Sequence, residues 1–382
     1  MKLWKVWSLF GAGAATLAAG LAYQAGCSST PSTSTQGLPP SPPASPTPAS
    51  SDVKTFAMNA LYLGEADRSG GAPSSSAWKS YGYNLDGKVT TKDSADVCTL
   101  AAGAPKTNQV DGNNGIDNSF GSVILPIIQS AASLPTPSAT ISQAIASGSF
   151  TIQLQITGLT TDAKQSSTGL TGELFASGKY PNGTPAFDQT TDWPVAPELL
   201  VDPADIGKGS KITFNNAYIN NGTFVSGDLT TGGITVSISL VFQGVALTLS
   251  VNHAVITFDH TADTDATNGT IAGVIDTNQL ITGLKSVAGR ISSSLCGSAF
   301  DGIAQQITQA SDIMSDGTNA SGKNCDGISI GLGFTAKEVK TPTQIETSDA
   351  AVPPDPCAAS DGGTPADTGT PDTGTTDAAG GG

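Results

Sequence analysis

Three stretches of the chain concentrate Asp and Asn, whose side-chain oxygens are ligands that Ca²⁺ takes in proteins. The first covers residues 82–93, the second contains Asp111, Asn113, Asn114, Asp117 and Asn118, and the third contains Asp259, Asp263, Asp265 and Asn268. Solvated loops commonly have the same composition. The second and third stretches are therefore predicted to be solvated loops, with calcium binding as the alternative.

In the first stretch, residues 82–93 resemble the twelve-residue calcium loop of dockerins and EF-hands. The resemblance assigns Asn84 and Asp86 to the third and fifth positions and Asp93 to the twelfth, where a carboxylate completes the ligand shell. Gly82 stands where the family has an aspartate, so the resemblance implies weak binding, with a dissociation constant of about 10⁻⁴ to 10⁻³ M. A β-turn over residues 85–88, which needs no metal, is the favoured interpretation.

Four aromatic residues are candidates for stacking on sugar rings, namely Trp78, Tyr81, Tyr83 and Trp193. The first three lie close together, before or at the start of the candidate calcium loop. An exposed group of this kind would form a carbohydrate platform. Large aromatic side chains are more often buried, and a core role is the favoured interpretation.

No catalytic motif is found in the sequence. A G-x-S-x-G elbow, an H-E-x-x-H pattern and a P-loop are all missing, and the S-x-x-K formed by Ser76 and Lys79 lacks its partner motifs. His253 follows the inward phase of a strand, whereas His260 is expected in a solvated acidic loop. The carboxylate pair of a glycosidase leaves no spacing rule in a sequence, so the question of an enzyme stays open.

The first 26 residues are typical of an export signal. Lys2 and Lys5 precede an uncharged, mainly apolar stretch over residues 6–23, and small residues precede Cys27. A retained transmembrane helix is the alternative. It is disfavoured because this glycine-diluted run of 18 residues is shorter than the about 20 apolar residues that span a bilayer.

The ending Ala25-Gly26-Cys27 resembles the lipobox of bacterial lipoproteins, although Gln24 stands where the family has an apolar residue. The resemblance implies that acyl chains on Cys27 anchor the protein to a membrane. Ser28 implies the outer membrane or cell surface. Soluble secretion after cleavage near Ala22 is the alternative.

Without its signal the chain has 15 basic and 32 acidic residues. Nucleic acid is not expected as a partner, because phosphate binding needs a basic patch. Four further cysteines, an even number in an oxidising compartment, are predicted to form disulfides: Cys98, Cys296, Cys325 and Cys357. Cys296 and Cys325 flank one predicted helix, which favours a bond between them and leaves the other two to pair by default.

Alternation of apolar and polar residues predicts antiparallel strands within a globular region over residues 54–340. The alternating runs are residues 150–156, 212–218, 234–242, 245–251 and 328–334, with a hairpin turn at Gln243-Gly244. Helical spacing predicts helices near residues 137–147, 277–291 and 298–314. The expected fold is mainly β, an antiparallel β-sandwich with a few packed helices.

Low-complexity segments flank this region. Residues 27–53 are expected to be a Ser/Thr/Pro-rich tether and residues 341–382 a disordered tail.

Together these features predict a membrane-anchored surface lipoprotein with a binding or adhesion role, with a glycan or another surface molecule as its partner. A secreted hydrolase that uses a carboxylate pair and a structural envelope lipoprotein are the alternatives.

Overall fold

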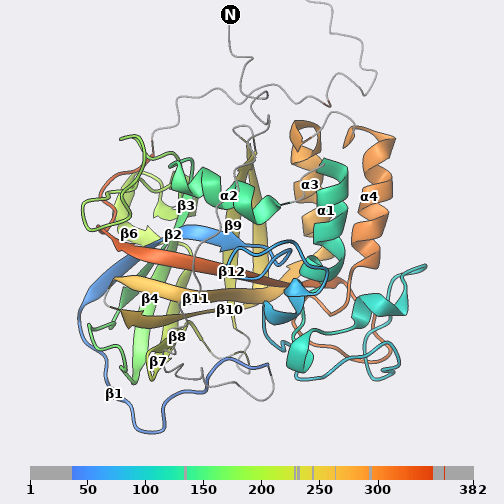
Figure 1. The fold of residues 1–382 in the computed structure, drawn as a ribbon, viewed down its shortest axis with the longest axis horizontal. Helices are drawn as coiled ribbons and strands as arrows, with labels where there is room; N and C mark the ends of the chain where they lie inside the picture. Colours follow the sequence, from blue (N-terminus) through green and yellow to red (C-terminus); the bar gives the residue numbers. More distant parts are fainter. Residues whose placement is uncertain are drawn as a thin grey trace, which may run out of the picture. The chain divides into compact units, whose positions relative to one another are not determined.

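Antiparallel strands make up most of the structure, a computed structural model of the chain (Figure 1). It describes residues 37–132, 136–227, 229, 233–242, 245–262, 264–291, 295–346 and 357. All of these belong to one unit, residues 34–382. The predicted signal and Cys27 lie outside the described residues, as does most of the predicted tail.

Eight strands close into an antiparallel barrel. Around the barrel the order is β4-β3-β2-β12-β11-β10-β8-β7, and β7 pairs again with β4, where Gly172 lies opposite Phe214. The strands are β2 (Val53–Tyr62), β3 (Thr151–Thr157), β4 (Ser167–Ser177), β7 (Thr213–Asn220), β8 (Thr223–Val225), β10 (Val245–Ala262), β11 (Asp265–Asp276) and β12 (Gly327–Val339).

The predicted β-sandwich is therefore wrong. Alternation along a strand shows only that one face is buried, and a closed barrel meets that condition as well as two packed sheets do. The β4–β7 pairing, which joins the two ends of the sheet, decides between them. The alternation pattern does not show which strands are neighbours, so this pairing was not predictable from it.

Phenylalanine side chains fill the barrel interior. Phe224 and Phe258 stack with ring centroids 4.8 Å apart, and Phe56 lies 5.6 Å from Phe258. Phe214 and Phe334 extend this group at 5.9 Å from Phe224 and 6.5 Å from Phe258. All five side chains are buried. An eight-stranded barrel has an interior just wide enough for side chains, so the centre is a packed core.

The predicted hairpin over residues 234–251 is present. β9 (Ile234–Phe242) pairs with β10 outside the barrel ring, with Phe242 opposite Val245. The two turn residues lie outside the described part of the chain. Three shorter strands complete the structure: β1 (Thr47–Pro48) beside β4, and the hairpin of β5 (Leu200–Asp202) and β6 (Asp205–Ser210).

Four α-helices cover parts of the barrel: α1 (Leu125–Ala132), α2 (Pro137–Ala146), α3 (Thr277–Ile291) and α4 (Ser298–Gln309). Figure 1 shows α3 and α4 side by side and α1 toward the same end of the molecule, with α2 apart from them near β2. The predictions for α2 and α3 are confirmed. α4 ends five residues earlier than predicted, because Ile313 leaves the helix to form a bridge with Gly327.

The described part of the expected tether runs along the barrel. Pro40 accepts a hydrogen bond from the Tyr218 hydroxyl at 2.6 Å, and Thr47 donates its N–H to Ser166 at 2.8 Å. At the other end, Ile345 forms a bridge with Val195. Residues 37–52 and 341–346 thus extend the ordered unit beyond the predicted globular region.

All four predicted disulfide cysteines are bonded, but as Cys98–Cys325 and Cys296–Cys357. The predicted Cys296–Cys325 pairing is wrong. α4 carries the chain about 18 Å away from Cys296, at 1.5 Å per residue. Cys325 then joins the segment around Cys98, where its N–H donates to Thr99.

Candidate functional site

A loop-rich segment over residues 63–119, called here the loop cap, contains the first two Asp/Asn stretches. Its regular structure is limited to short 3-10 helices, at Ala77–Ser80, Lys106–Gln109 and Asn113–Gly115. The Cys98–Cys325 disulfide and a 2.7 Å hydrogen bond between the Tyr83 and Thr257 hydroxyls attach it to the barrel domain. Long-range contacts therefore hold the loop cap in place.

Three aspartates of the loop cap and one from the segment after α4 form an acidic cluster: Asp86, Asp111, Asp117 and Asp312. Asp117 Oδ2 accepts the N–H of Leu85 at 2.7 Å, and Asp111 Oδ2 accepts the N–H of Thr90. A 2.7 Å hydrogen bond from the Gly112 N–H to the Ile116 carbonyl oxygen closes the turn between Asp111 and Asp117, and the two side chains interact. The structure thus brings together residues from both Asp/Asn stretches.

The other two carboxyl groups of the cluster are held by neighbouring donors. Asp86 Oδ2 accepts the Asn319 side-chain N–H at 2.8 Å, and Asp86 Oδ1 accepts the Lys88 N–H at 2.7 Å. Asp312 accepts both the N–H and the hydroxyl of Ser329. These two carboxylates are therefore better supplied with donors than Asp111 and Asp117.

Burial dominates the electrostatics of the cluster. It raises the pKa of Asp111 and that of Asp312 to about 7, and the pKa of Asp117 well above its usual range. The negative charge of Asp86 adds to each of these increases. Among the described residues, no ion pair joins a Lys or Arg side chain to any member of the cluster. Lys88, the nearest in sequence, pairs instead with Asp96.

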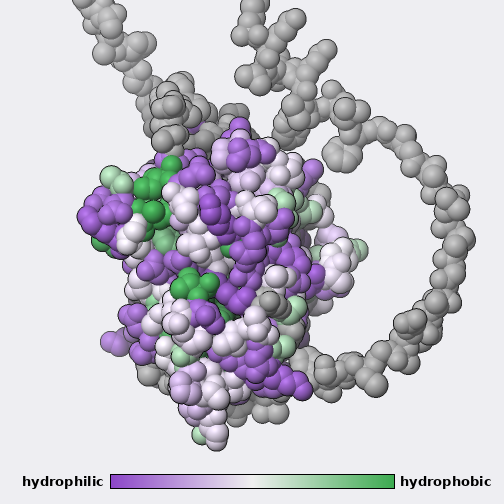
Figure 2. Space-filling model, turned by 90° about the vertical axis from the view of Figure 1, so that its left-hand side faces the viewer, coloured by the Kyte–Doolittle hydropathy of each residue, from purple (hydrophilic) through white to green (hydrophobic). Residues whose placement is uncertain are grey.

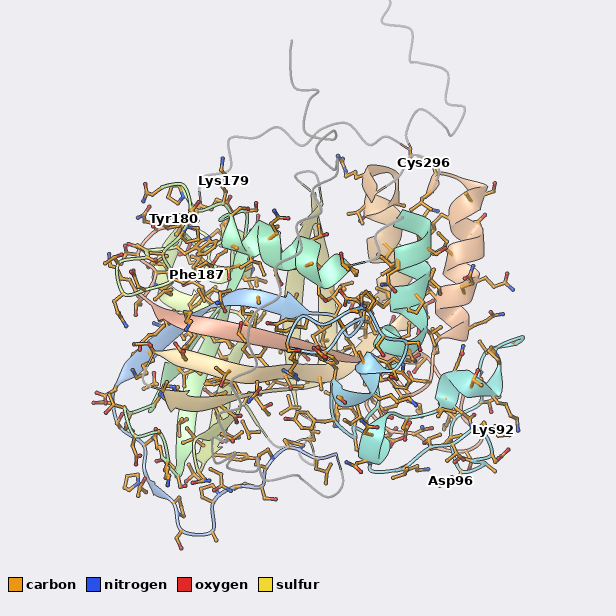
Figure 3. All side chains as sticks on the ribbon, viewed as in Figure 1. Lys92, Asp96, Lys179, Tyr180, Phe187 and Cys296 are labelled. Atoms are coloured by element: carbon orange, nitrogen blue, oxygen red, sulfur yellow. A yellow bond between two sulfur atoms is a disulfide. The ribbon has the colours of Figure 1, made fainter. Side chains whose placement is uncertain are left out.

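The predicted calcium ligands Asn84, Asp86 and Asp93 do not converge. Asn84 and Asp86 lie at the acidic cluster, but the Asp93 side chain is 80% exposed and lies beside Lys92. Figure 3 shows Lys92 and Asp96 at the outer edge of the loop cap. In the part of the chain that the structure describes, no group of three or more His, Cys, Asp or Glu side chains is arranged to hold a metal ion.

The third Asp/Asn stretch lies at the β10–β11 end, and its described carboxyl groups are supplied with donors. Asp259 accepts hydrogen bonds from Thr223 and Asn268 at 2.9 Å, and Asp265 pairs with Lys337 at 2.8 Å. Asp263 lies outside the described residues. This stretch therefore differs from the acidic cluster, in which two carboxyl groups face each other.

Neither histidine has the environment that the sequence predicts. His260 is buried instead of solvated, and its Nε2 lies 3.0 Å from the Thr160 carbonyl oxygen. His253 is only half-buried, because the β10 register shifts beside it and its φ of 48° takes it out of the strand phase. The two ring nitrogens of His260 contact main-chain carbonyl oxygens, of Asp265 and Thr160.

The four candidate sugar-binding aromatics do not form a platform. Trp193 is fully buried between Tyr180 and Phe187, and its indole N–H donates to Gly178 at 2.7 Å. Tyr81 is also buried, while Tyr83 and Trp78 are half-buried. Figure 3 shows Tyr180 and Phe187, which mark the Trp193 environment, at the opposite side of the molecule from the loop cap.

A small polar cavity of about 150 Å³ lies across three neighbouring barrel strands. This polar groove is lined by Gln155 and Thr157 of β3, Thr171, Gly172 and Glu173 of β4, and Thr213 and Asn215 of β7. Glu173 accepts the N–H of Ser210 from the β6 end at 3.0 Å. The alternation of apolar and polar residues indicates which residues of a strand point outward. It does not show that these outward residues lie together, which depends on the β4–β7 pairing.

The surface is otherwise mostly hydrophilic. Figure 2 shows two small hydrophobic areas on the face that carries β6 and its neighbouring loops. The exposed large hydrophobic residues within the described ranges are Leu38, Val53, Val89 and Val201, which are scattered along the chain. None of the described helices combines the length and the apolar character that a bilayer span requires.

Comparison with known proteins adds no relative: no family model, curated protein or solved structure matches this chain.

Proposed function

We propose that the protein is an exported lipoprotein, anchored to a membrane by acyl chains on Cys27, whose barrel domain binds a hydroxyl-rich ligand of the glycan type in the polar groove. The Ala25-Gly26-Cys27 ending supports the anchor. The pairing of the other four cysteines in disulfides supports export, because such bonds persist in oxidising compartments.

The polar groove is the observation that carries the binding proposal. The barrel interior is filled by side chains, so a ligand has to bind outside it. Amide, hydroxyl and carboxylate groups line the groove and match the alternating donors and acceptors of sugar hydroxyls. Since no aromatic ring lines it, we expect weak binding, with a dissociation constant of about 1 mM or a binding free energy of roughly 4 kcal/mol.

Binding without turnover fits the site better than hydrolysis. Glu173 is the one ionisable residue in the lining, whereas glycoside hydrolysis uses two carboxyl groups, about 5 to 9.5 Å apart, on either side of the bond. The Asp111–Asp117 pair does not supply this chemistry, because the Asp117 side chain is buried.

A glycan array with the purified protein tests the binding proposal. Binding should be lost in Gln155→Ala and Asn215→Ala, which remove hydrogen-bonding groups from the groove, and kept in Asn182→Ala, an exposed asparagine outside it. Release of reducing sugar from a bound glycan would contradict a pure binding role. Binding that survives both groove variants would place the ligand elsewhere.

Mass spectrometry of the N-terminal peptide from protein isolated with its membrane tests the anchor. The expected peptide begins at Cys27 and carries acyl chains, each methylene of which contributes about 0.8 kcal/mol when buried in the bilayer. An unmodified chain that begins at another residue would contradict the anchor without affecting the groove.

A further inference from the structure

The acidic cluster has more oxygen acceptors than donors. The hydrogen bond from the Gly112 N–H to Ile116 O, 2.7 Å long, brings Asp111 and Asp117 together. Among the described residues each of their carboxyl groups accepts one main-chain N–H, from Thr90 and Leu85. Two neighbouring buried carboxylates repel each other unless a proton or a cation lies between them. The described side chains supply no Lys or Arg for this purpose.

Two further oxygens beside this pair are buried without a hydrogen-bond partner among the described residues. They are Asn84 Oδ1 and Thr90 Oγ1, from side chains that are 4% and 3% exposed. The orientation of the Asn84 amide is set by its Nδ2, which donates to Lys88 O at 2.6 Å. Its Oδ1 is thus an acceptor with no donor, and buried polar atoms in this state are rare in folded proteins.

Both oxygens belong to the segments that hold the carboxylate pair. Thr90 donates its own N–H to Asp111, and Leu85, the residue after Asn84, donates its N–H to Asp117. The Asn84 amide is also enclosed by Gly115, where an added Cβ would lie 2.6 Å from Asn84 Nδ2. Residues 84–90 and 111–117 therefore pack around one oxygen-rich interior.

We propose that this interior is a divalent-cation site of the calcium type, with the carboxylates of Asp111 and Asp117 and the Oδ1 of Asn84 as its protein ligands. Thr90 Oγ1 adjoins the site, and water completes the shell. Ca²⁺ fits this ligand set because it takes six to eight oxygens in flexible geometry. Zinc does not fit, because it is bound chiefly by Cys and His side chains.

Asp86 contributes charge to this site without being a ligand. Its two oxygens are each held by a donor, Lys88 N–H at 2.7 Å and Asn319 Nδ2 at 2.8 Å. The ligand set thus contains two carboxylates, in accord with the absence, among the described residues, of a three-carboxylate metal arrangement. It differs from the calcium-loop resemblance over residues 82–93, with which it shares only Asn84. It is also independent of glycan binding in the polar groove.

Thermal unfolding of the full chain with and without metal tests the proposal. At pH 7.5, after removal of bound metal with chelator, Ca²⁺ at about 100 times its dissociation constant should raise the melting temperature by on the order of 5 °C. Calorimetric titration of the same protein with CaCl₂ should give one site per chain. The absence of both a shift and a binding signal at millimolar Ca²⁺ would overturn the proposal and leave a proton shared between Asp111 and Asp117.

Two amide variants locate the metal. Asp117→Asn and Asp111→Asn keep the side-chain shape and remove a charge, so in chelator each should melt at or above the wild-type temperature while the Ca²⁺-dependent rise is lost. The matched control Asp93→Asn, in the same loop cap but exposed, should keep the rise. A rise that persists in both amide variants, or that is lost in Asp93→Asn, would overturn the assignment. If one amide variant does not fold, the other variant and the calorimetric titration of the wild type still test the assignment.

Discussion

Two buried sites of charge in this molecule are built in opposite ways. Inside one end of the barrel, Lys54 of β2 and Glu338 of β12 form an ion pair at 2.9 Å, with about a tenth of each side chain exposed. Phe56 belongs to the hydrophobic core and lies directly opposite Glu338 in the β2–β12 register. Residues directly opposite each other share one face of the sheet, so the ion pair lies on the interior face. In the loop cap, Asp111 and Asp117 face each other, and no Lys or Arg of the described residues pairs with them.

The difference shows how each region meets the cost of burying charge. In the barrel, strand pairing brings a cation and an anion from distant parts of the chain to one place, so the site is complete within the protein. In the loop cap, the carboxylates require protons or a cation from solution. The barrel site should therefore be insensitive to chelator and mild acid, whereas the loop cap should respond to both.

Breaking the ion pair in the barrel should have the largest effect. Lys54→Met leaves Glu338 buried without its partner, which we expect to lower the free energy of unfolding by about 3–5 kcal/mol. Chemical denaturation measures this loss. The double variant Lys54→Met with Glu338→Leu removes both charges and should recover most of it. A single variant within 1 kcal/mol of wild type would show that the pair is solvated.

Removing the disulfide that attaches the loop cap should have the next largest effect. Cys98→Ser with Cys325→Ser should lower the free energy of unfolding by about 2–4 kcal/mol, since the bond joins residues 227 apart in sequence and restricts the unfolded chain. Non-reducing peptide mapping of the wild type should find Cys98 bonded to Cys325. A Cys296–Cys325 peptide would contradict the structure itself.

The stability of the metal-free protein should fall as the pH rises from about 4 to about 7. Burial raises the pKa of Asp312 from its ordinary 3.8 to about 7, so the folded protein binds this proton more tightly than the unfolded chain does. The resulting stabilisation is fully present below pH 3.8 and is lost through pH 7, with a slope of up to about 1.4 kcal/mol per pH unit for each such group. Urea unfolding in chelator at several pH values measures the slope, which should decrease in Asp312→Asn.

The smallest effect is expected at the surface. Lys337 and Asp265 also pair at 2.8 Å, but their side chains are 40% and 28% exposed. Lys337→Ala should therefore lower the free energy of unfolding by about 1 kcal/mol or less. The Lys54–Glu338 and Lys337–Asp265 pairs have nearly the same distance but differ in burial. Comparing Lys337→Ala with Lys54→Met under the same denaturant conditions therefore tests the effect of burial. Equal losses would show that burial has no role.

Local patterns in the sequence were sufficient for several elements. The helix over Thr277–Ile291 and the β9–β10 hairpin depend on neighbours within a few residues, and their periodicity predicts them correctly. The burial of Trp193 follows from its size and apolar character. The participation of four cysteines in disulfides was predicted from their even number and from the export that the N-terminal signal indicates.

Contacts between residues that are distant in sequence were determined by the tertiary structure. The pairing of β4 with β7 closes the barrel, and the return of the chain after α4 brings Cys325 to Cys98 instead of Cys296. The contact between Asp111 and Asp117 beside Asn84 combines two loops that local spacing treats as separate. Periodicity records which face of an element is buried, but not what lies against that face. Pairing across the chain is set by the combined packing of the whole barrel and its loop cap.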